Sequence, residues 1–398
     1  ISNLMAKTKV EFVCRECGAS HHQWAGQCLD CKEWNTLEEI VISQATSSKP
    51  ESLKDLPASK VQNLTEIKAQ NKDRLSTGLS ELDRTLGGGL VDGSVVLIGG
   101  DPGIGKSTLI LQALAKLNSD NTTLYVSGEE SAEQVSERAI RFGIKEDILF
   151  IGETHLEKII KLSKDIKPKV IVIDSIQTMV TDLSGSAPGS VTQVRDCAAQ
   201  LTQYAKQTNT ILLMIGHVTK GGALAGPRIL EHMVDAVLYF EGDAGGRYRI
   251  IRAVKNRFGA VNEISVFAMG EKGLQQVSNP SSIFLSNQEN PSSGSMVMVT
   301  REATRPLLVE IQALVDQSNG TPKRVSVGLD QNRLALQLAI LHKHSGIATF
   351  DQDVFINVVG GIKVSETASD LVVMLSIVSS LRDKVIPSKW IAFGEVGL

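Results

Sequence analysis

The chain has 398 residues, of which 42% are hydrophobic and 21% charged, an ordinary globular profile with room for two to four domains. Lysine and arginine number 41 against 44 acidic residues, so a net charge of −3 excludes a globally basic chain and leaves any nucleic-acid site to a local patch. Apolar runs fall short of a membrane helix, and the N-terminus lacks the apolar core of a signal peptide. We therefore expect a cytoplasmic, nucleoid-associated protein with no membrane contact.

Four of the five cysteines crowd together near the N-terminus, as Cys14, Cys17, Cys28 and Cys31. Two C-x-x-C pairs at this spacing are typical of the knuckles that close one tetrahedral Zn²⁺ site. His21 and His22 are weaker candidate ligands, and a redox pair is a weaker alternative because one C-x-x-C would suffice. The pattern predicts a zinc finger over residues 10–36, which could not fold without its metal.

Three compositional blocks follow one another along the chain. Residues 41–72 contain no aromatic side chain and are rich in Ser, Lys and Gln, which predicts a flexible linker. From residue 75 onward, apolar runs alternate with helical stretches. Strands are expected at 94–98, 123–126, 148–151, 170–173 and 211–215, and near 236–241, 248–254 and 261–268; helices are expected at 106–117, 131–142 and 191–207, with another between residues 151 and 170. Alternating βα units with continuous apolar strands predict an α/β fold, a parallel sheet covered by helices on both faces.

Beyond a loop rich in Ser and Asn at 284–295, an α+β block is expected. Its predicted strands lie around 296–300, 307–315, 355–359 and 390–393, and its helices at 331–344 and 369–382. The pattern stops in mid-course at the last residue, so further residues are expected to follow in the full-length protein.

Residues 100–107 read Gly-Asp-Pro-Gly-Ile-Gly-Lys-Ser and fit the pattern G-x-x-x-x-G-K-[ST] between an apolar strand and a helix. A Gly-rich turn alone is often only a turn, but the eight-residue match in this context predicts an ATP site. Backbone N–H groups close around phosphate oxygens, Lys106 reaches the β- and γ-phosphates, and Ser107 holds Mg²⁺. The predicted nucleotide-binding residues are Gly100, Asp101, Pro102, Gly103, Ile104, Gly105, Lys106, Ser107 and Thr108.

Three acidic residues are candidates for hydrolysis. Asp174 ends the apolar run 170–173, where P-loop enzymes carry the carboxylate near the metal, although an aspartate there can also cap a helix. Glu129 and Glu130 follow another strand and precede a helix, so they could simply favour the helix N-terminus. The functional interpretation makes one of them the base that orients the attacking water, and the sequence does not choose between them.

His217 follows the apolar strand at 211–215. A lone histidine at such a place is often structural. The end of this strand points toward the γ-phosphate in a P-loop fold, where a polar side chain can sense the phosphate, and the two interpretations stay open.

The segment 244–262 carries five cations and no acidic residue. Its cations are Arg247, Arg249, Arg252, Lys255 and Arg257. Because a strand alternates its faces, the first two are expected to point the same way, with the last two just past the strand's end. A charge run is usually a solvated face, but cations mixed with Asn256 and Phe258 suit phosphate contacts and base stacking, or a charge that reaches a neighbour's nucleotide.

Together these residues resemble the RadA (Sms) family of bacterial DNA-repair ATPases, which have a RecA-like core. The resemblance covers nearly the whole chain and rests on the four-cysteine finger, on residues 76–90 leading into the P-loop and on VIVIDS at 170–175. Its most specific part is the motif Lys255, Asn256, Arg257, Phe258 and Gly259, which the resemblance ties to DNA binding and coupling. It implies a hexameric ring that hydrolyses ATP, moves on single-stranded and branched DNA and drives branch migration with a RecA-type recombinase.

The resemblance also implies a RecA-like ATPase domain over 73–275 and a Lon-protease-like domain over 280–398. The peptidase serine of Lon lies in a Pro-Ser-Ala-Gly stretch, and the matching residues 367–370 read Thr-Ala-Ser-Asp, with alanine at the nucleophile. The partner lysine would lie beyond residue 398. We therefore expect no active peptidase, and a role for this domain in ring assembly or DNA contact.

Two alternatives to a DNA-dependent ATPase motor, a helicase or branch-migration enzyme, remain. A Lon-type ATP-dependent protease would need an intact Ser/Lys dyad, which is not visible. A KaiC-like ATPase without a DNA role would explain neither the zinc finger nor the acid-free basic run.

Overall fold

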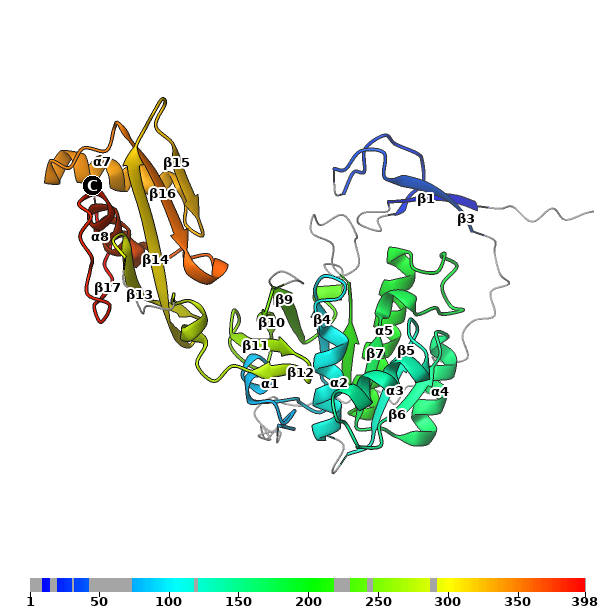
Figure 1. The fold of residues 1–398 in the computed structure, drawn as a ribbon. Coiled ribbons are helices and arrows are strands. Elements are labelled where there is room, and N and C mark those ends of the chain that lie inside the picture. The colour runs from blue at the N-terminus through cyan, green and yellow to red at the C-terminus, as the bar shows by residue number, and fades with distance from the viewer. Residues whose placement is uncertain are drawn as a thin grey trace, which may run out of the picture. The chain divides into compact units, whose positions relative to one another are not determined.

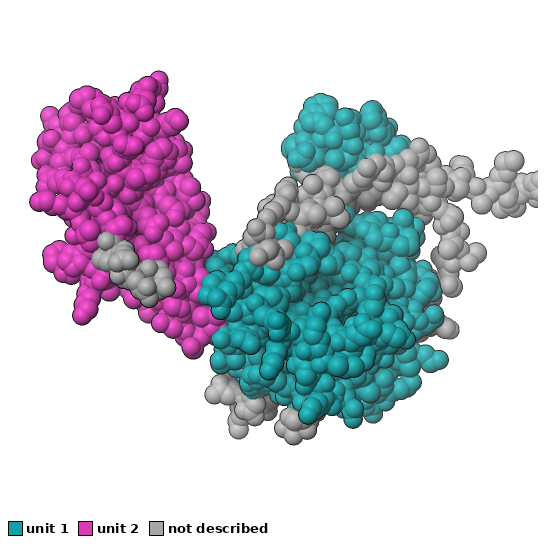
Figure 2. Space-filling model, viewed as in Figure 1, with its two compact units in different colours: residues 1–276 teal, residues 277–398 magenta. Residues whose placement is uncertain are grey.

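The computed structural model describes residues 9–14, 20–30, 32–42, 74–117, 121–217, 230–241, 246–286 and 292–397. The chain divides into two compact units, residues 1–276 and 277–398 (Figure 2). The predicted metal ligands Cys17 and Cys31 and nearly all of the predicted linker lie outside the described residues. Within the described ranges, no helix combines the length and the hydropathy that a membrane span requires.

A small antiparallel sheet carries the N-terminal cysteines. Strands β1 (Lys9–Cys14), β2 (Ser20–His21) and β3 (Leu37–Ile42) lie in the order β2-β1-β3, and Cys14 pairs with Leu37. This small sheet, called the ribbon from here on, extends to residue 42. The zinc finger was predicted to end at residue 36, so the ribbon includes the first residues of the predicted linker. Its core consists of Cys14, Cys28 and Leu37, which is too little apolar surface to support a fold alone.

The ATPase core is built on a nine-stranded sheet (Figure 1). In spatial order its strands are β12 (Gly273–Gln276), β11 (Ile264–Gly270), β10 (Tyr248–Asn256), β9 (Ala236–Glu241), β4 (Val95–Gly99), β8 (Ile211–Ile215), β7 (Val170–Asp174), β5 (Thr123–Ser127) and β6 (Leu149–Gly152). The six strands from β9 to β6 run parallel, and β10, β11 and β12 join them as antiparallel neighbours. The sequence did not predict β12.

Helices cover both faces of this sheet. Alternate residues of the buried strand β4 enter opposite cores: Val96 and Ile98 pack with one cluster, and Val95 and Leu97 with the other. The first core takes up α1 (Ser80–Thr85), α2 (Lys106–Leu117) and α3 (Ala132–Arg141); the second takes up α4 (Leu156–Ile166) and α5 (Val191–Thr208). The predicted α/β class, with a parallel sheet covered on both faces, is confirmed.

The C-terminal unit is an α+β structure. Its sheet has the order β15 (Arg324–Val327), β16 (Gln352–Val358), β14 (Arg305–Gln317), β13 (Ser295–Glu302) and β17 (Ile391–Ala392). Helix α8 (Asp370–Leu381) packs on β13 and β14, and α7 (Gln331–Ser345) packs beside β15 and α8. The sequence did not predict β15, whose four residues alternate between partly exposed and exposed.

Candidate functional site

Four neighbouring parallel strands end at one edge of the ATPase sheet. In the register of the sheet, Ile98 of β4 pairs with Ile215 of β8, which pairs with Asp174 of β7, which pairs with Ser127 of β5. The P-loop, His217, Asp174 and the pair of glutamates therefore leave the sheet side by side. In open α/β sheets, ligands bind at this carboxyl edge.

The P-loop runs from β4 into the N-terminus of α2. Gly100, Gly103 and Gly105 have φ values of 147°, 74° and 114°, in the left-handed region that glycine adopts at little cost. The Nζ of Lys106 is buried and donates to the carbonyl oxygens of Gly100 and Asp101, at 2.8 and 2.9 Å. Burial lowers the pKa of Lys106 to about 8, even though nearby Asp174 and Asp101 favour its charged form. This loop can hold phosphate oxygens on its N–H groups and its lysine.

Asp174 lies at the end of β7 and is buried against the start of α2. Desolvation raises the pKa of its carboxyl group, while hydrogen bonds from the Tyr125 and Ser107 hydroxyl groups act in the opposite direction. A hydroxyl and a carboxylate so placed are ligands of the kind that Mg²⁺ prefers beside a nucleotide. The donor set therefore fits the predicted Mg²⁺ site.

Glu129 follows β5 through a tight turn, and its charge interacts with that of the P-loop lysine. The Ser127 hydroxyl accepts from the N–H of Glu130 at 2.9 Å, and a Cβ at Gly128 would lie 2.2 Å from the Thr178 hydroxyl, so only glycine allows this close approach. The Glu129 carboxylate accepts a hydrogen bond from Ser175. Its Oε1 lies 3.2 Å from Nε2 of His217.

These neighbours keep Glu129 ionised. The hydrogen bond from His217 lowers the pKa of the Glu129 carboxyl group, supported by Ser175 and the charge of Lys106 and opposed by partial burial. An ionised carboxylate at this edge is able to accept a proton from water.

Glu130 points elsewhere. Its carboxylate forms an ion pair with Arg138 of α3, and both side chains are largely covered. Helix α3 starts at a capping box in which Ser131 and Gln134 exchange hydrogen bonds, and this fixes the helix beside the turn. Of the two candidates that the sequence left open, it is therefore Glu129 that contacts Ser175 and His217.

His217 follows β8, and hydrogen bonds to both its backbone and its side chain hold it in place. The Gln177 amide donates to the His217 carbonyl oxygen at 3.3 Å, while the imidazole Nε2 meets Glu129. Both the His217 Nδ1 and the Gln177 Oε1 are buried without a hydrogen-bond partner among the described residues. The structure thus brings the predicted phosphate sensor into contact with the candidate base.

The motif at 255–259 lies at the other end of the sheet. Asn256 pairs with Ala236, and Ala236 pairs with Val96 near the start of β4, whereas the P-loop follows the end of β4. A five-residue strand spans about 13 Å, so the motif lies a full strand length away from the nucleotide site of its own chain.

Two cations of this motif face partners that neutralise them in part. Lys255 donates from Nζ to the Glu231 carbonyl oxygen at 2.6 Å, and Arg257 lies 3.4 Å from Asp235 with most of its side chain exposed. Desolvation and the neighbouring charge of Arg257 lower the pKa of Lys255. An anionic ligand would reduce the repulsion between these two cations.

The expectation that the cations of the basic run are available for phosphate contacts is wrong for Arg249. Arg249 is 2% exposed and lies on the core face of β10 together with Ile251, so it does not offer its charge to solvent. Lys255 lies within β10 rather than past its end. The burial pattern explains the difference, because Arg249 occupies a core position that apolar residues usually fill.

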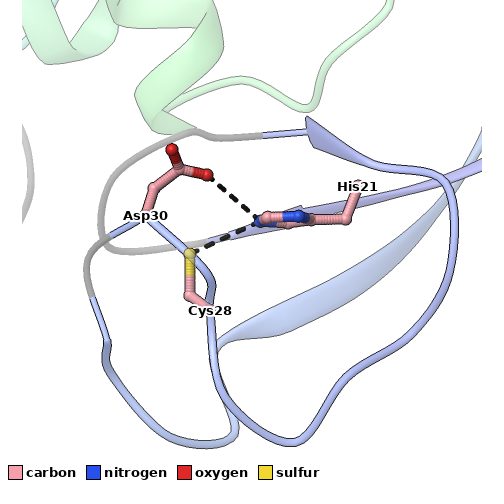
Figure 3. Close-up of side chains that lie close together, drawn as sticks. All are labelled: His21, Cys28 and Asp30. Carbon is pink, nitrogen blue, oxygen red and sulfur yellow. Dashed lines mark hydrogen bonds and ion pairs between the residues drawn. The ribbon is translucent and has the colours of Figure 1, made fainter.

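In the ribbon, His21, Cys28 and Asp30 form a cluster that could hold a metal ion (Figure 3). Cys14 and Cys28 are buried, and Nε2 of His21 lies 3.5 Å from Sγ of Cys28 and 3.6 Å from the Asp30 carboxylate. Sulfur and nitrogen atoms at this separation fit two corners of a tetrahedron around an ion with bonds of about 2.0–2.3 Å. The donors therefore suit zinc, with His21 either as a ligand or as a neighbour of the Cys28 thiolate.

In the C-terminal unit, residues 367–369 form a short turn, and α8 begins directly after it at Asp370. The Ser369 hydroxyl is buried and donates to the Glu366 carbonyl oxygen at 2.8 Å. The Asp370 carboxylate accepts from Arg333 at 2.5 and 2.6 Å and from Gln337 at 2.7 Å. These contacts tie the turn to α7.

Comparison with known proteins agrees with this architecture. The family model of KaiC, an ATPase, matches residues 75–150, and that of the rubredoxin metal binding domain matches residues 12–39. The DNA repair protein RadA of Pseudomonas aeruginosa is 57% identical over 99% of this chain and 87% of its own length. The RadA proteins of Escherichia coli and Bacillus subtilis are 54% and 47% identical, with the same coverage.

The chain belongs to the RadA family. It is accordingly a DNA repair ATPase, with an ATP-binding core and an N-terminal metal-binding ribbon. The resemblance proposed from its motifs is confirmed.

Several residues at the nucleotide site of this RadA-family chain were not predicted from the sequence. Tyr125, Ser175, Gln177 and Arg138 each contact a predicted residue. A signal exists for Ser175, which directly follows Asp174 at the end of a strand. The others lie between 8 and 49 residues from their partners, a separation at which sequence spacing carries no information.

The lowered pKa of Lys106 predicts that nucleotide binding takes up a proton in mildly alkaline solution. Phosphate charges favour the ammonium form and raise a pKa that is about 8 without nucleotide. At about pH 8.5, ADP binding should therefore take up a fraction of a proton, and at about pH 6.5 this uptake should vanish because Lys106 is already charged. Calorimetry in two buffers of different ionisation enthalpy measures the uptake.

Lys106→Arg is the matched control, since it keeps the cation but does not titrate in this range. A Lys106→Arg protein that binds ADP with the same uptake at alkaline pH would show that another group is responsible.

The different partners of the two glutamates predict different mutant properties. Glu129→Gln should reduce ATP turnover by about a hundredfold or more, the usual effect of losing a general base, while ATP binding stays near that of the unmutated chain. Glu130→Gln should keep most of the turnover and instead lower the melting temperature, because Arg138 loses its partner. Steady-state kinetics, nucleotide binding and thermal melting on both proteins check this, and the reverse pattern would assign the base to Glu130.

Proposed function

We propose that the chain is a DNA-dependent ATPase motor, a helicase or branch-migration enzyme that processes recombination intermediates in DNA repair. The observation that carries this proposal is the layout of one sheet. Its carboxyl edge collects the residues that we propose for ATP hydrolysis, and its opposite end carries the cations Lys255 and Arg257, which Asp235 offsets only in part.

Hydrolysis needs four roles, and the described residues supply each of them. P-loop N–H groups and Lys106 would hold the ATP phosphates, and Ser107 and Asp174 would hold Mg²⁺, which would supply positive charge against the phosphates. Glu129 accepts the proton of the attacking water. His217 couples this carboxylate to the γ-phosphate, because its Nε2 already lies 3.2 Å from the Glu129 carboxylate.

The motif at 255–259 divides into anchors and contacts. Asn256 is buried and donates to the Thr85 carbonyl oxygen at 3.1 Å, and its own side-chain oxygen accepts from the N–H of Phe258 at 2.8 Å. A Cβ at Gly259 would lie 2.7 Å from Cα of Gly87, so the two backbones touch. These residues fix the motif to the loop after α1, and Lys255, Arg257 and Phe258 remain for DNA.

The distance between the motif and its own P-loop favours an assembly. A cation that acts on a γ-phosphate from this position must belong to a neighbouring chain, and a ring brings the two together while it encloses DNA. A homo-hexameric ring that acts on single-stranded and branched DNA in the cytoplasm with a RecA-type recombinase fits the proposal. A KaiC-like ATPase without DNA contact is the alternative that the test below addresses.

We propose zinc as the metal of the ribbon, held by Cys14, Cys17, Cys28 and Cys31. For the C-terminal unit we propose a role in ring assembly or DNA contact rather than peptide hydrolysis. A buried serine that donates to a backbone carbonyl is not a nucleophile, and Ser369 is so placed.

Replacing the two cations of the motif tests the motor directly. Lys255→Ala and Arg257→Ala should each weaken binding of single-stranded DNA of any sequence and reduce the salt dependence of the affinity by about 0.7 unit per lost phosphate contact. DNA-stimulated ATP turnover should fall in parallel. Fluorescence anisotropy over a series of salt concentrations and steady-state ATPase assays with and without DNA provide the measurements.

Lys169→Ala is the matched control. Lys169 precedes β7 at the same end of the sheet, and its ammonium already lies 2.7 Å from Asp92. Loss of turnover without DNA, at unchanged DNA affinity, would assign Lys255 or Arg257 to a neighbour's nucleotide. If both variants keep normal DNA binding and normal turnover, the motif is a solvated face and the DNA motor is wrong.

For the ribbon, metal analysis should find one zinc per chain. Cys28→Ser should lose the metal and leave ATP turnover without DNA intact, because the nucleotide site is built from other elements. Cys197→Ser should keep the zinc, since burial in α5 raises the pKa of its thiol to about 12 and prevents it from forming a thiolate. His21→Ala separates the two roles of this histidine, because retention of the full zinc content makes His21 a neighbour and not a ligand. Iron in place of zinc would contradict the assignment.

A further inference from the structure

Arg249 places a cation beneath the P-loop, in a position that the hydrolytic roles described above do not use. Along β10, Arg249, Ile251 and Ala253 alternate onto the same face, and the last two belong to the core that also contains Ile104 of the P-loop. Arg249 is 2% exposed. The strand therefore carries its guanidinium group into the core beside α2.

The contacts of this guanidinium join the P-loop to the start of β10. Nε donates to the Ile104 carbonyl oxygen at 2.8 Å. Nη1 donates to the Tyr248 carbonyl oxygen at 3.0 Å and also to that of Gly246. A planar fork of donors can satisfy acceptors on two separate segments at once, which a single ammonium group does less well.

The carbonyl group of Ile104 belongs to the same peptide unit as the N–H of Gly105. This peptide is trans, so its oxygen and its N–H point in opposite directions in one plane. Loops of this sequence direct their N–H groups at phosphate oxygens. A donor that fixes the direction of the Ile104 oxygen therefore also fixes the opposite direction of the Gly105 N–H, which is the side on which the nucleotide would bind.

The surroundings of Gly105 make the orientation of the Ile104–Gly105 peptide depend on its contact with Arg249. Gly105 has a φ of 114°, and a Cβ there would lie 2.8 Å from Cε of Met269. Glycine itself has no strong preference for this conformation, so external contacts must select it. Arg249 also brings a positive charge, which strengthens the dipole of the peptide that it holds.

We infer that Arg249 is a positioning residue of the nucleotide site, which acts through the Ile104–Gly105 peptide to hold one N–H of the P-loop against the phosphates of ATP and ADP. It is not a DNA contact, although its place in the basic run suggested that role. A buried guanidinium group is costly unless it is hydrogen-bonded, and its contacts with the P-loop supply such bonds.

The test compares nucleotide affinity in three variants of the full chain. Arg249→Met removes the donors and the charge at similar length, and it should raise the Kd of both ADP and ATP by about tenfold to a hundredfold, the range for a lost charge-assisted hydrogen bond. Arg249→Lys keeps the charge and one donor direction, and its Kd should lie between those of Arg249→Met and the unmutated chain. At saturating ATP, kcat should change much less than KM, because the peptide contacts bound substrate and transition state alike.

Arg252→Met is the matched control on the same strand. Arg252 pairs with Glu241 at the surface, at 2.6 Å, and its loss should leave nucleotide Kd within about twofold of the unmutated chain. If Arg249→Met does not fold, as judged by near-ultraviolet circular dichroism, Arg249→Lys decides the question.

Normal ADP and ATP affinity in folded Arg249→Lys and Arg249→Met proteins would overturn the inference, even if their melting temperatures fall. Weaker DNA binding with unchanged nucleotide Kd would also overturn it and return Arg249 to the DNA surface. Lys106→Ala on the same preparations distinguishes this failure from a wrong nucleotide site, because normal ADP binding by that variant would remove the P-loop assignment itself.

Discussion

The burial of two opposite charges at the carboxyl edge of the sheet governs the rest of the nucleotide site. Lys106 and Asp174 are each 4% exposed, and desolvation moves their pKa values toward neutrality, downward for the lysine and upward for the aspartate. The lysine nitrogen donates to carbonyl groups of its own loop, and the carboxylate accepts from hydroxyl groups. A nucleotide and its metal ion would give Lys106 and Asp174 partners of full opposite charge. These interactions would therefore stabilise the bound ligand.

The hydrolytic side of the site is arranged around a less buried carboxylate. Glu129 lies where Ser175, His217 and Lys106 all favour its ionised form, so the pKa of its carboxyl group is set by residues that follow three different strands, β7, β8 and β4. A change in any of these strands reaches the carboxylate directly. Because Glu129 and His217 share one hydrogen bond, an anion bound near His217 would alter Glu129, the residue that we propose as the base that activates water.

The sequence predicted those parts of the structure that depend on residues close together in the chain. The P-loop pattern and the apolar strands both act over a few residues, and the α/β architecture followed from their order. The choice between Glu129 and Glu130 did not follow, because it depends on Arg138 and on Ser175, which is 46 residues away. Arg249 was misjudged for a related reason: charge patterns along a strand do not reveal which face is buried when a cation occupies a core position.

The antiparallel strand β10 connects two features of the core that lie at opposite ends of the sheet. Near one end Arg249 contacts the P-loop, and at the other end lie the partly exposed Lys255 and, just past the strand, the exposed Arg257. β10 pairs with β11 from Tyr248 to Arg252 and with β9 from Ile250 to Asn256, with a β-bulge between Ala253 and Lys255, and Arg257 directly follows the strand. One strand therefore joins Arg249, which contacts the P-loop, to the cations that we propose for DNA, so β10 is a direct covalent connection between the two proposed sites.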